Sequence, residues 1–254
     1  MLSTRTDAEL INKTIEKYGK VVKTEELIPI FLTKFGKESA YNRIHVLSRN
    51  GWFIRIKQGL YIVNDSITGQ FQGDLPFLVI SHCLFEDSYV SLAHALHYHK
   101  LVDQVPDTIS SISDQSSKKF SYQSYTFKIT KVKPDIYFGY HTISQQKRTV
   151  LIAEPEKALL DYLYVDINFS TPELFFQPIK KHPEAIDFEK LQQYALRFSS
   201  NVRRKTGFLL DHLKIDTKQL YASIKDSRGY TKLTKESTQF NRKWRVYYED
   251  KYLH

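Results

Sequence analysis

A short turn at Gln58-Gly59 is the sequence feature that most restricts the fold of this chain. It separates two β-prone runs, residues 52–57 and 60–63, and a glycine between two such runs is typical of a β-hairpin. Directly before the hairpin, Gly51 ends a helical pattern that we expect to run from Ser39, as its N-cap, to Asn50. The chain therefore begins with a domain in which a hairpin immediately follows a helix.

Two further helical patterns precede this helix. Apolar residues recur at three- and four-residue spacing from Asp7 to Tyr18. A short extended piece, Val21–Lys23, leads to a second helix from Glu25 to about Phe31, with Thr24 as its expected N-cap. Three helices followed by a basic hairpin is the order of a winged helix-turn-helix, which we expect over residues 1–66.

The third helix has the two faces that a DNA-recognition helix needs. Ala40, Ile44 and Leu47 share one face and are expected to pack inward, while the opposite face is polar. Arginine can pair with guanine, and asparagine with adenine, through two hydrogen bonds each. Strand alternation is expected to place Arg55 and Lys57 on one side of the hairpin. The residues expected to contact DNA are Lys37, Ser39, Asn42, Arg43, His45, Arg49, Arg55 and Lys57.

The net charge of +9 is unevenly distributed. Residues 1–70 carry a net charge of +4, residues 71–196 a net charge of −3, and residues 197–254 a net charge of +8. Clustered positive charge attracts polyanions such as nucleic acids. A solvated basic surface without any partner has the same composition, so charge alone does not decide between the two interpretations.

The composition indicates a globular protein of the cytoplasm. Hydrophobic residues make up 41% and charged residues 26% of the 254 positions, as in ordinary folded domains. Cys83 is the single cysteine, so no intramolecular disulfide can form and a reducing compartment is expected. The N-terminus lacks the apolar run of a signal peptide, and no stretch approaches the ~18 apolar residues of a membrane span. We therefore expect no membrane partner.

The remainder of the chain predicts a larger mixed α+β domain over residues 74–254, after a loop at residues 64–74. The expected fold class is thus α+β. Helices are expected at Tyr89–Lys100, Ala153–Tyr164, Phe188–Phe198 and Asn201–Leu213. Two or three strands are expected within Ile109–Tyr137, with another at Thr149–Ile152.

Three groups of residues resemble catalytic or metal sites but lack the required spacing. The three histidines of residues 94–99 have no carboxylate at a metalloprotease position. Glu156 and Asp161 diverge by about 140° on a helix and so cannot share a metal or a proton. Asp135 follows a proline as in one nuclease signature, but no acid-x-lysine element comes after it. No glycine-rich phosphate loop is present, so we expect no cofactor and no enzyme activity.

The basic C-terminal segment is a second candidate binding surface. Residues 203–205 open an amphipathic helix, and residues 241–248 interleave cations with aromatic side chains. This mixture suits RNA or single strands through stacking and phosphate contact, and it suits an acidic protein equally well. A strand with alternating surface charge is the third interpretation. The candidate residues of this surface are Arg203, Arg204, Lys205, Arg242, Lys243 and Arg245.

Several motifs along the chain match one bacterial family. The strongest are Tyr89–His99, followed by Gln104-Val105-Pro106, and Ala153–Asp161. The hairpin, Asn201–Leu213 and Trp244-Arg245-Val246 also fit. Together these motifs resemble the AbiEi-type antitoxins of type IV toxin–antitoxin systems of abortive infection, which are also described as a family of transcriptional regulators.

The resemblance implies two linked roles. The winged helix would bind inverted repeats of double-stranded DNA near its own promoter as an autorepressor, with a homodimer as the possible bound form. The C-terminal domain would counteract a co-encoded nucleotidyltransferase-type toxin. Two alternatives stay open. One is a transcription factor whose C-terminal domain dimerises or senses a ligand, and the other is a nuclease that uses Asp135.

Overall fold

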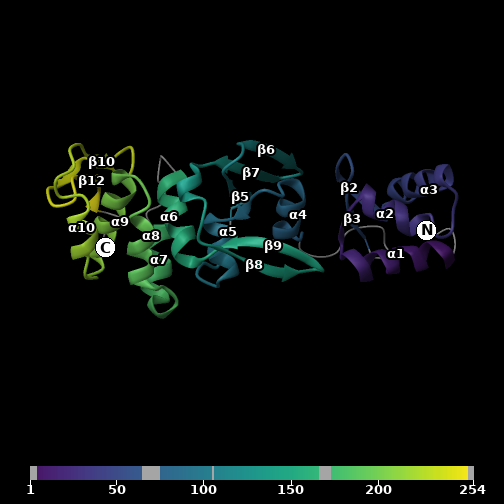
Figure 1. The fold of residues 1–254 in the computed structure, drawn as a ribbon, viewed down its shortest axis with the longest axis horizontal. Helices are drawn as coiled ribbons and strands as arrows, with labels where there is room; N and C mark the ends of the chain where they lie inside the picture. Colours follow the sequence, from purple (N-terminus) through teal and green to yellow (C-terminus); the bar gives the residue numbers. More distant parts are fainter. Residues whose placement is uncertain (1–4, 65–74, 105, 166–172, 251–254) are drawn as a thin grey trace. The chain divides into compact units, whose positions relative to one another are not determined.

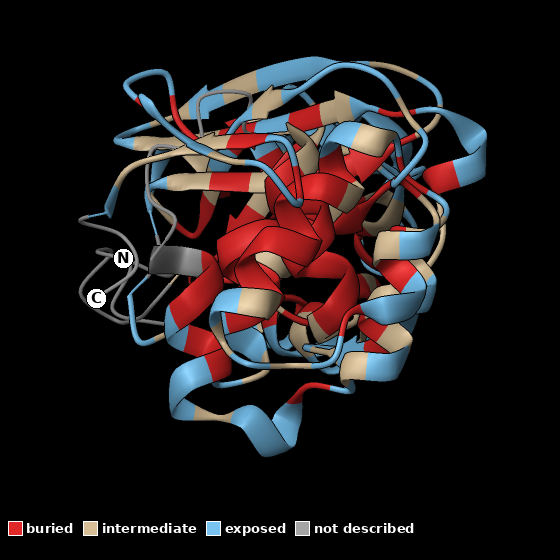
Figure 2. Cartoon of the chain, turned by 90° about the vertical axis from the view of Figure 1, so that its left-hand side faces the viewer, coloured by how far each residue is buried: buried red, intermediate tan, exposed pale blue. Residues whose placement is uncertain are grey.

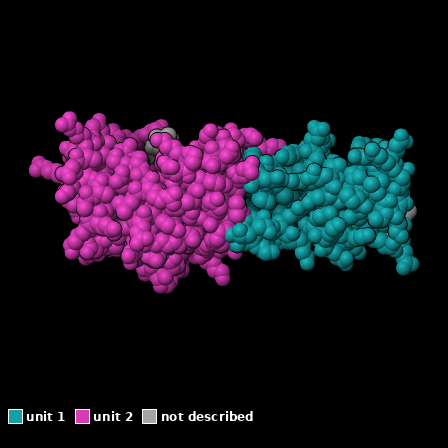
Figure 3. All heavy atoms as spheres, viewed as in Figure 1, with its two compact units in different colours: residues 1–86, 142–150 teal, residues 87–141, 151–254 magenta. Residues whose placement is uncertain are grey.

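The computed structural model describes residues 5–64, 75–104, 106–165 and 173–250. They form a mixture of helices and several sheets, which confirms the expected α+β class (Figure 1). Figure 3 shows two compact units, the first made of residues 1–86 and 142–150 and the second of residues 87–141 and 151–254. Of the loop expected at residues 64–74, residues 65–74 lie outside the described residues, so a domain boundary there stays a prediction.

The first unit places three helices before a hairpin. Its elements are α1 (Arg5–Tyr18), β1 (Val21–Lys23), α2 (Thr24–Phe31), α3 (Lys37–Arg49), β2 (Phe53–Lys57), β3 (Leu60–Val63) and α4 (Phe77–Leu84). The strands form one antiparallel sheet in the order β1-β3-β2. Two predicted helix caps are wrong by one or more residues. Gly36, in an extended conformation, precedes α3 in place of Ser39, and Lys23 precedes α2 in place of Thr24.

The core of the first unit forms where the apolar faces of the helices meet the sheet. Ala40, Ile44 and Leu47 are at most 4% exposed, so the predicted inward face of α3 is confirmed. They lie in one cluster with Leu10 of α1 and Phe31 of α2. Burying an apolar side chain of this size stabilises the fold by about 1.5–3 kcal/mol, and the shared core therefore fixes which face of α3 remains outside.

Residues 142–150 complete the first unit through one arginine. The Arg148 guanidinium donates from both terminal nitrogens to the Glu26 carboxylate, at 2.6 Å each, and to the Val21 carbonyl at 2.8 Å. Although burial acts in the opposite direction, the hydrogen bonds from Arg148 and from the Lys23 amide lower the pKa of Glu26. This ion pair therefore links the N-terminal turn of α2 and strand β1 to the segment that contains Arg148.

After the first-unit helix α4, the chain contributes six strands to one sheet of order β6-β7-β5-β4-β9-β8. The elements of this part of the chain are β4 (Tyr89–Val90), α5 (Leu92–Tyr98), β5 (Thr108–Ser113), β6 (Lys118–Tyr122), β7 (Tyr125–Lys131), a 3-10 turn (Pro134–Ile136), β8 (Tyr140–Gln145), β9 (Arg148–Ala153) and α6 (Pro155–Val165). After these come α7 (Glu173–Lys181), a 3-10 turn (Pro183–Ala185), α8 (Phe188–Ala195), α9 (Ser200–His212) and α10 (Lys218–Ala222). The helices at the centre of Figure 2 are largely buried, and exposed residues lie on the surrounding loops and strands.

A small sheet ends the described part of the chain, within the basic C-terminal segment. It contains β10 (Thr231–Lys232), β11 (Gln239–Asn241) and β12 (Val246–Tyr248) in the order β10-β12-β11. β10 runs parallel to β12, and β11 runs antiparallel to it. Because β12 is central, its residues Val246 and Tyr247 pair with strands on both sides.

The helix predicted from Tyr89 to Lys100 is wrong at its beginning. Tyr89 and Val90 form a central strand, paired with β5 on one side and β9 on the other, and α5 starts only at Leu92. Tyr89 is fully buried, and its hydroxyl lies 3.0 Å from Asp161 Oδ2 and accepts a hydrogen bond from Lys157 Nζ at 2.7 Å. The fully buried ion pair between Lys157 and Asp161 thus anchors α6 to this strand.

Two histidines at the C-terminal end of α5 contact backbone carbonyl oxygens. His97 Nδ1 lies 2.9 Å from the Val102 carbonyl oxygen, and His99 Nε2 lies 2.8 Å from that of Ala153. Among the residues that the structure describes, no group of three or more histidine, cysteine, aspartate or glutamate side chains is placed to hold a metal ion. Within the same residues, no helix combines the length and the apolar character needed to cross a membrane.

Burial of His94 predicts a loss of stability in mild acid. Its side chain is 6% exposed, and burial, together with the nearby His97, lowers its pKa from 6.5 to about 4. Between these two pH values the unfolded chain takes up a proton that the folded chain does not, so the free energy of unfolding decreases as the pH falls from 6.5 to 4, by up to about 3 kcal/mol. The loss is measured by urea denaturation at several pH values, and His94→Gln should remove this part of the slope. Equal slopes for both proteins would show that His94 does not contribute.

Candidate nucleic-acid interface

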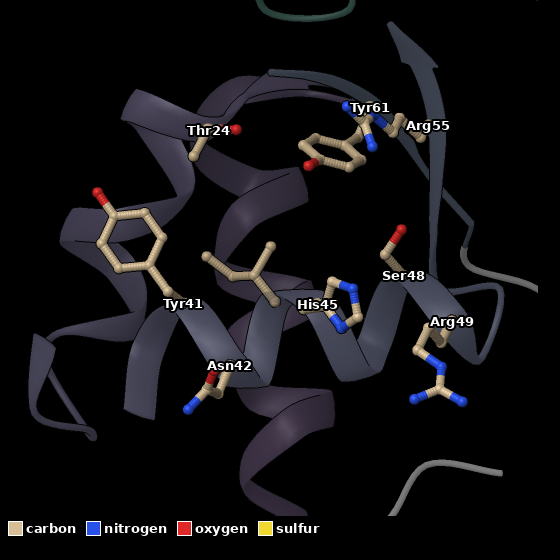
Figure 4. Close-up of a pocket in the computed structure, with 9 residues that line it drawn as sticks. Thr24, Tyr41, Asn42, His45, Ser48, Arg49, Arg55 and Tyr61 are labelled. Atoms are coloured by element: carbon tan, nitrogen blue, oxygen red, sulfur yellow. The ribbon is translucent and has the colours of Figure 1, made fainter. Parts of the chain in front are cut away.

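The first unit has an open cleft of about 700 Å³ between α3 and the hairpin. We call it the α3 cleft. Its walls come from the N-terminus of α2, from one side of α3 and from strands β2 and β3 (Figure 4). The residues that line it are Thr24, Tyr41, Asn42, Ile44, His45, Ser48, Arg49, Arg55 and Tyr61.

The rotation of α3 about its axis decides which side chains reach this cleft. Because successive residues turn by about 100°, the inward row of Ala40, Ile44 and Leu47 leaves the adjoining polar residues outside. In Figure 4 Tyr41 and Ser48 extend from α3 toward the side of Tyr61, whereas Asn42 and Arg49 extend the other way. The cleft therefore has a polar edge along α3 that solvent or a ligand can reach.

Positive charge is concentrated at this cleft. Arg49 and Arg55 are exposed, as is His45, and none of the described residues that line the cleft is acidic. Hydrogen-bond donors and acceptors are available from Asn42 and from the Tyr41 hydroxyl. The arrangement can hold a negatively charged ligand that also presents hydrogen-bonding edges.

The two basic residues of the hairpin do not follow the regular alternation of side chains along a strand. Arg55 lies opposite Tyr61, but the pairing register shifts between Arg55 and Lys57. Such a β-bulge breaks the alternation of side chains, so the prediction that Arg55 and Lys57 share one side does not follow from the observed register. Lys57 is half-buried. The hydrogen bond from Lys23 is the main cause that lowers the pKa of Glu86, and the charge of Lys57 contributes to the same shift.

Arg43 is the predicted contact residue that the structure places elsewhere. Its Nε donates to Asp7 Oδ1 at 2.6 Å, and its Nη2 donates to Oδ2 of the same carboxylate. Asp7 is fully buried in α1, and the Arg43 side chain is only 22% exposed. The guanidinium therefore joins α3 to α1 and does not line the cleft, which corrects its assignment to the DNA-facing set.

The remaining predicted residues divide into two groups. Asn42, His45, Arg49 and Arg55 line the α3 cleft, whereas Lys37 and Ser39 are exposed in the first turn of α3 and do not line it. Several further cleft residues were not predicted, because the prediction took only polar positions of α3 and the basic positions of the hairpin. Those residues are Thr24, Tyr41, Ile44, Ser48 and Tyr61.

The predicted C-terminal surface is partly internal. Arg204 is 1% exposed, and its Nη2 donates to the Ser227 carbonyl, the Ser227 hydroxyl and the Arg228 carbonyl at 2.7–3.0 Å. Lys205 is 6% exposed. These two residues lie on the inner side of α9, which corrects their placement at the surface, while Arg203 is half-buried. Exposed positions are limited to Arg242, Lys243 and Arg245.

The ion pair between Arg43 and Asp7 predicts a stability effect that is separate from binding. Arg43→Ala leaves the buried Asp7 carboxylate without its guanidinium partner, which should lower the free energy of unfolding by about 3 kcal/mol. Arg49→Ala is the matched control, because Arg49 is exposed and its loss should change stability by less than about 0.5 kcal/mol. Urea denaturation measures both, and equal losses would contradict the structural role assigned to Arg43.

Comparison with known proteins places this architecture among solved folds. No family model matches the chain, and no curated protein matches it significantly in sequence. The fold is similar to that of the RV2827C protein from Mycobacterium tuberculosis, which is known from a crystal structure. The TM-score is 0.66 at 13% sequence identity, with 95% of this chain and 90% of that chain covered. This similarity concerns the fold alone.

Proposed function

We propose that the N-terminal residues form a winged helix-turn-helix that binds double-stranded DNA, with α3 as the recognition helix and the β2–β3 hairpin as the wing. The observation that carries the proposal is the α3 cleft. Asn42, His45 and Arg49 of α3 meet Arg55 of the hairpin around a space whose described lining contains no acidic side chain. These are side chains that read base edges and bind phosphates.

The order of the elements supports this assignment. A short turn joins α2 to α3, and the hairpin follows α3 directly, as in helix-turn-helix proteins with a wing. With its side chains an α-helix is about 10–12 Å across, which fits the major groove, about 12 Å wide, and at 1.5 Å per residue the 13 residues of α3 extend over about 20 Å. Arg43 and Asp7 hold this helix from behind and leave its outer face free to dock.

The wider role that we propose is that of a cytoplasmic autorepressor and antitoxin, without enzyme activity. It would bind an inverted-repeat operator, in keeping with two copies of one domain reading two half-sites. The second unit would counteract a nucleotidyltransferase-type toxin. The support for this part is the sequence resemblance of Tyr89–His99 and Ala153–Asp161 to AbiEi-type antitoxins. A transcription factor with a dimerising or ligand-sensing second unit is the alternative.

DNA binding should depend on the basic residues of the α3 cleft. Arg49→Ala and Arg55→Ala should each weaken binding to promoter duplex by about 1–3 kcal/mol if the side chain contacts a base. If it contacts a phosphate, the slope of log affinity against log salt should fall by about 0.9. Titration of a labelled promoter duplex at several salt concentrations distinguishes the two cases.

The control for this titration is Lys13→Ala, which removes one exposed positive charge from α1, outside the cleft. It should leave the affinity nearly unchanged. If all three variants bind as the unaltered protein does, or if all three weaken equally, the cleft is not the DNA interface.

The antitoxin role predicts that substitutions in the first unit abolish promoter repression without abolishing neutralisation of the toxin. Co-expression of the full chain with the product of the adjacent gene should restore growth. The double variant Arg49→Ala, Arg55→Ala should still restore growth while it loses repression of its own promoter, because the two changes lie in the first unit. Growth curves and a promoter fusion measure the two outcomes. Failure of the unaltered chain to restore growth would favour the transcription-factor alternative.

A further inference from the structure

The small C-terminal sheet exposes a row of aromatic side chains on one face. Tyr247 of β12 lies directly opposite Phe240 of β11 and Lys232 of β10 in the strand register. Residues that lie opposite one another on paired strands point to the same face. The ring centroids of Phe240 and Tyr247 are 4.8 Å apart, and those of Tyr230 and Tyr247 are 5.3 Å apart. We call Tyr230, Tyr247 and Phe240 the aromatic row.

Burial of the other face explains why this row remains outside. Val246 is fully buried, and Tyr248 packs its ring 5.0 Å from that of Phe208 in α9. Strand alternation then directs Tyr247, which lies between them, to the opposite side. Phe240 is 44% and Tyr230 is 62% exposed, although phenylalanine is among the residues that are most often buried. Two exposed rings beside the half-buried Tyr247 indicate a face that a ligand covers when it binds.

Trp244, the aromatic residue that stands out in the sequence, is not part of this row. It is fully buried, and its indole nitrogen donates to Asp211 Oδ2 at 2.7 Å. A Cβ atom at position 207 would lie 2.1 Å from its ring, so Gly207 is required for this packing. The aromatic face of the segment therefore differs from the one that the interleaved sequence pattern predicts.

Positive charge accompanies the aromatic row. The Lys232 ammonium lies 5.9 Å from the centroid of the Tyr247 ring. Lys232 also lines an adjacent cavity of about 350 Å³ together with Lys205, and none of the described residues of that cavity is acidic. Residues 197–254 hold 14 lysine and arginine residues against 6 aspartate and glutamate residues, the strongest positive excess in the chain. An anion on this face would be attracted both at the row and at the cavity beside it.

We propose that this face binds single-stranded nucleic acid. Bases would stack on Tyr230, Tyr247 and Phe240, and phosphates would lie at Lys232 and at the cavity that Lys232 shares with Lys205. Unpaired bases expose the flat faces that stack on aromatic rings, whereas a duplex hides them. An acidic protein would use the same cations but has no need of a row of adjacent aromatic rings. The observations therefore favour a single strand, and this site is independent of the α3 cleft.

The test is the affinity of the full chain for a fluorescein-labelled oligouridine, measured by anisotropy. All proteins carry Arg49→Ala and Arg55→Ala, so that the proposed duplex interface does not contribute. Stacking on one ring is worth about 1–3 kcal/mol per base. Phe240→Ala and Tyr230→Ala should therefore each weaken binding by roughly 5- to 150-fold. Phe240→Trp, which keeps a stacking surface, should bind about as well as the parent.

Two controls keep the result specific. Tyr98→Ala removes another exposed aromatic ring of the second unit and should not change the affinity. Phe240→Leu keeps apolar bulk without a ring and should lose binding as Phe240→Ala does, which covers the case in which the alanine variant fails to fold. A duplex of the same length should bind more weakly than oligouridine.

Three results would overturn the proposal. The first is no binding of oligouridine at low salt. The second is an equal affinity of the Phe240→Ala and Tyr98→Ala variants. The third is displacement of oligouridine by polyglutamate with a potency that the ring substitutions do not alter, which would assign the face to an acidic protein partner instead.

Discussion

The ion pair between Arg43 and Asp7 is the constraint on which the candidate DNA interface depends. An amphipathic helix that rests on apolar contacts alone could rotate slightly, since such contacts are not directional. The two-pronged contact of a guanidinium with a buried carboxylate is directional and fixes one side of α3 against α1. With Arg43 held there, Asn42 and Arg49, which lie about 100–120° away from it around the helix axis, are directed to the outside. The contact on the inner side of α3 therefore fixes which side of the helix forms the candidate DNA interface.

In the second unit, packing likewise decides which side of a strand is exposed. Trp244 closes over Gly207 of α9, and Asp211 of the same helix accepts hydrogen bonds from Trp244 and from Lys243. These contacts hold the start of β12 against α9 and bury Val246. Once one face of a strand is buried in this way, the period of two residues leaves the next side chain exposed. The position of Tyr247 on the open face is therefore a consequence of packing that involves other residues.

Local periodicity predicted individual helices and the hairpin. It did not predict features that depend on contacts between residues far apart in the sequence. The inward row of α3 follows from spacing within one helix, and the hairpin follows from a glycine turn between two β-prone runs. Arg43 pairs with a residue 36 positions away, and Arg204 pairs with carbonyl groups 23 and 24 positions away. The periodicity of one helix gives no information about partners so distant in the sequence. Tyr89 shows the same limit, because its strand exists only through its neighbours β5 and β9.

The two proposed surfaces would select different forms of nucleic acid by the chemistry that they present. The α3 cleft offers amide, imidazole and guanidinium groups, which recognise base edges that a duplex displays in its grooves. The aromatic row offers ring faces, which can stack only on bases that have left a helix. Both surfaces carry positive charge, so salt weakens both and cannot distinguish them. The distinction lies in the contact each substitution removes, a hydrogen bond at Arg49 and a stacking surface at Phe240, so one chain can hold both specificities without competition between them.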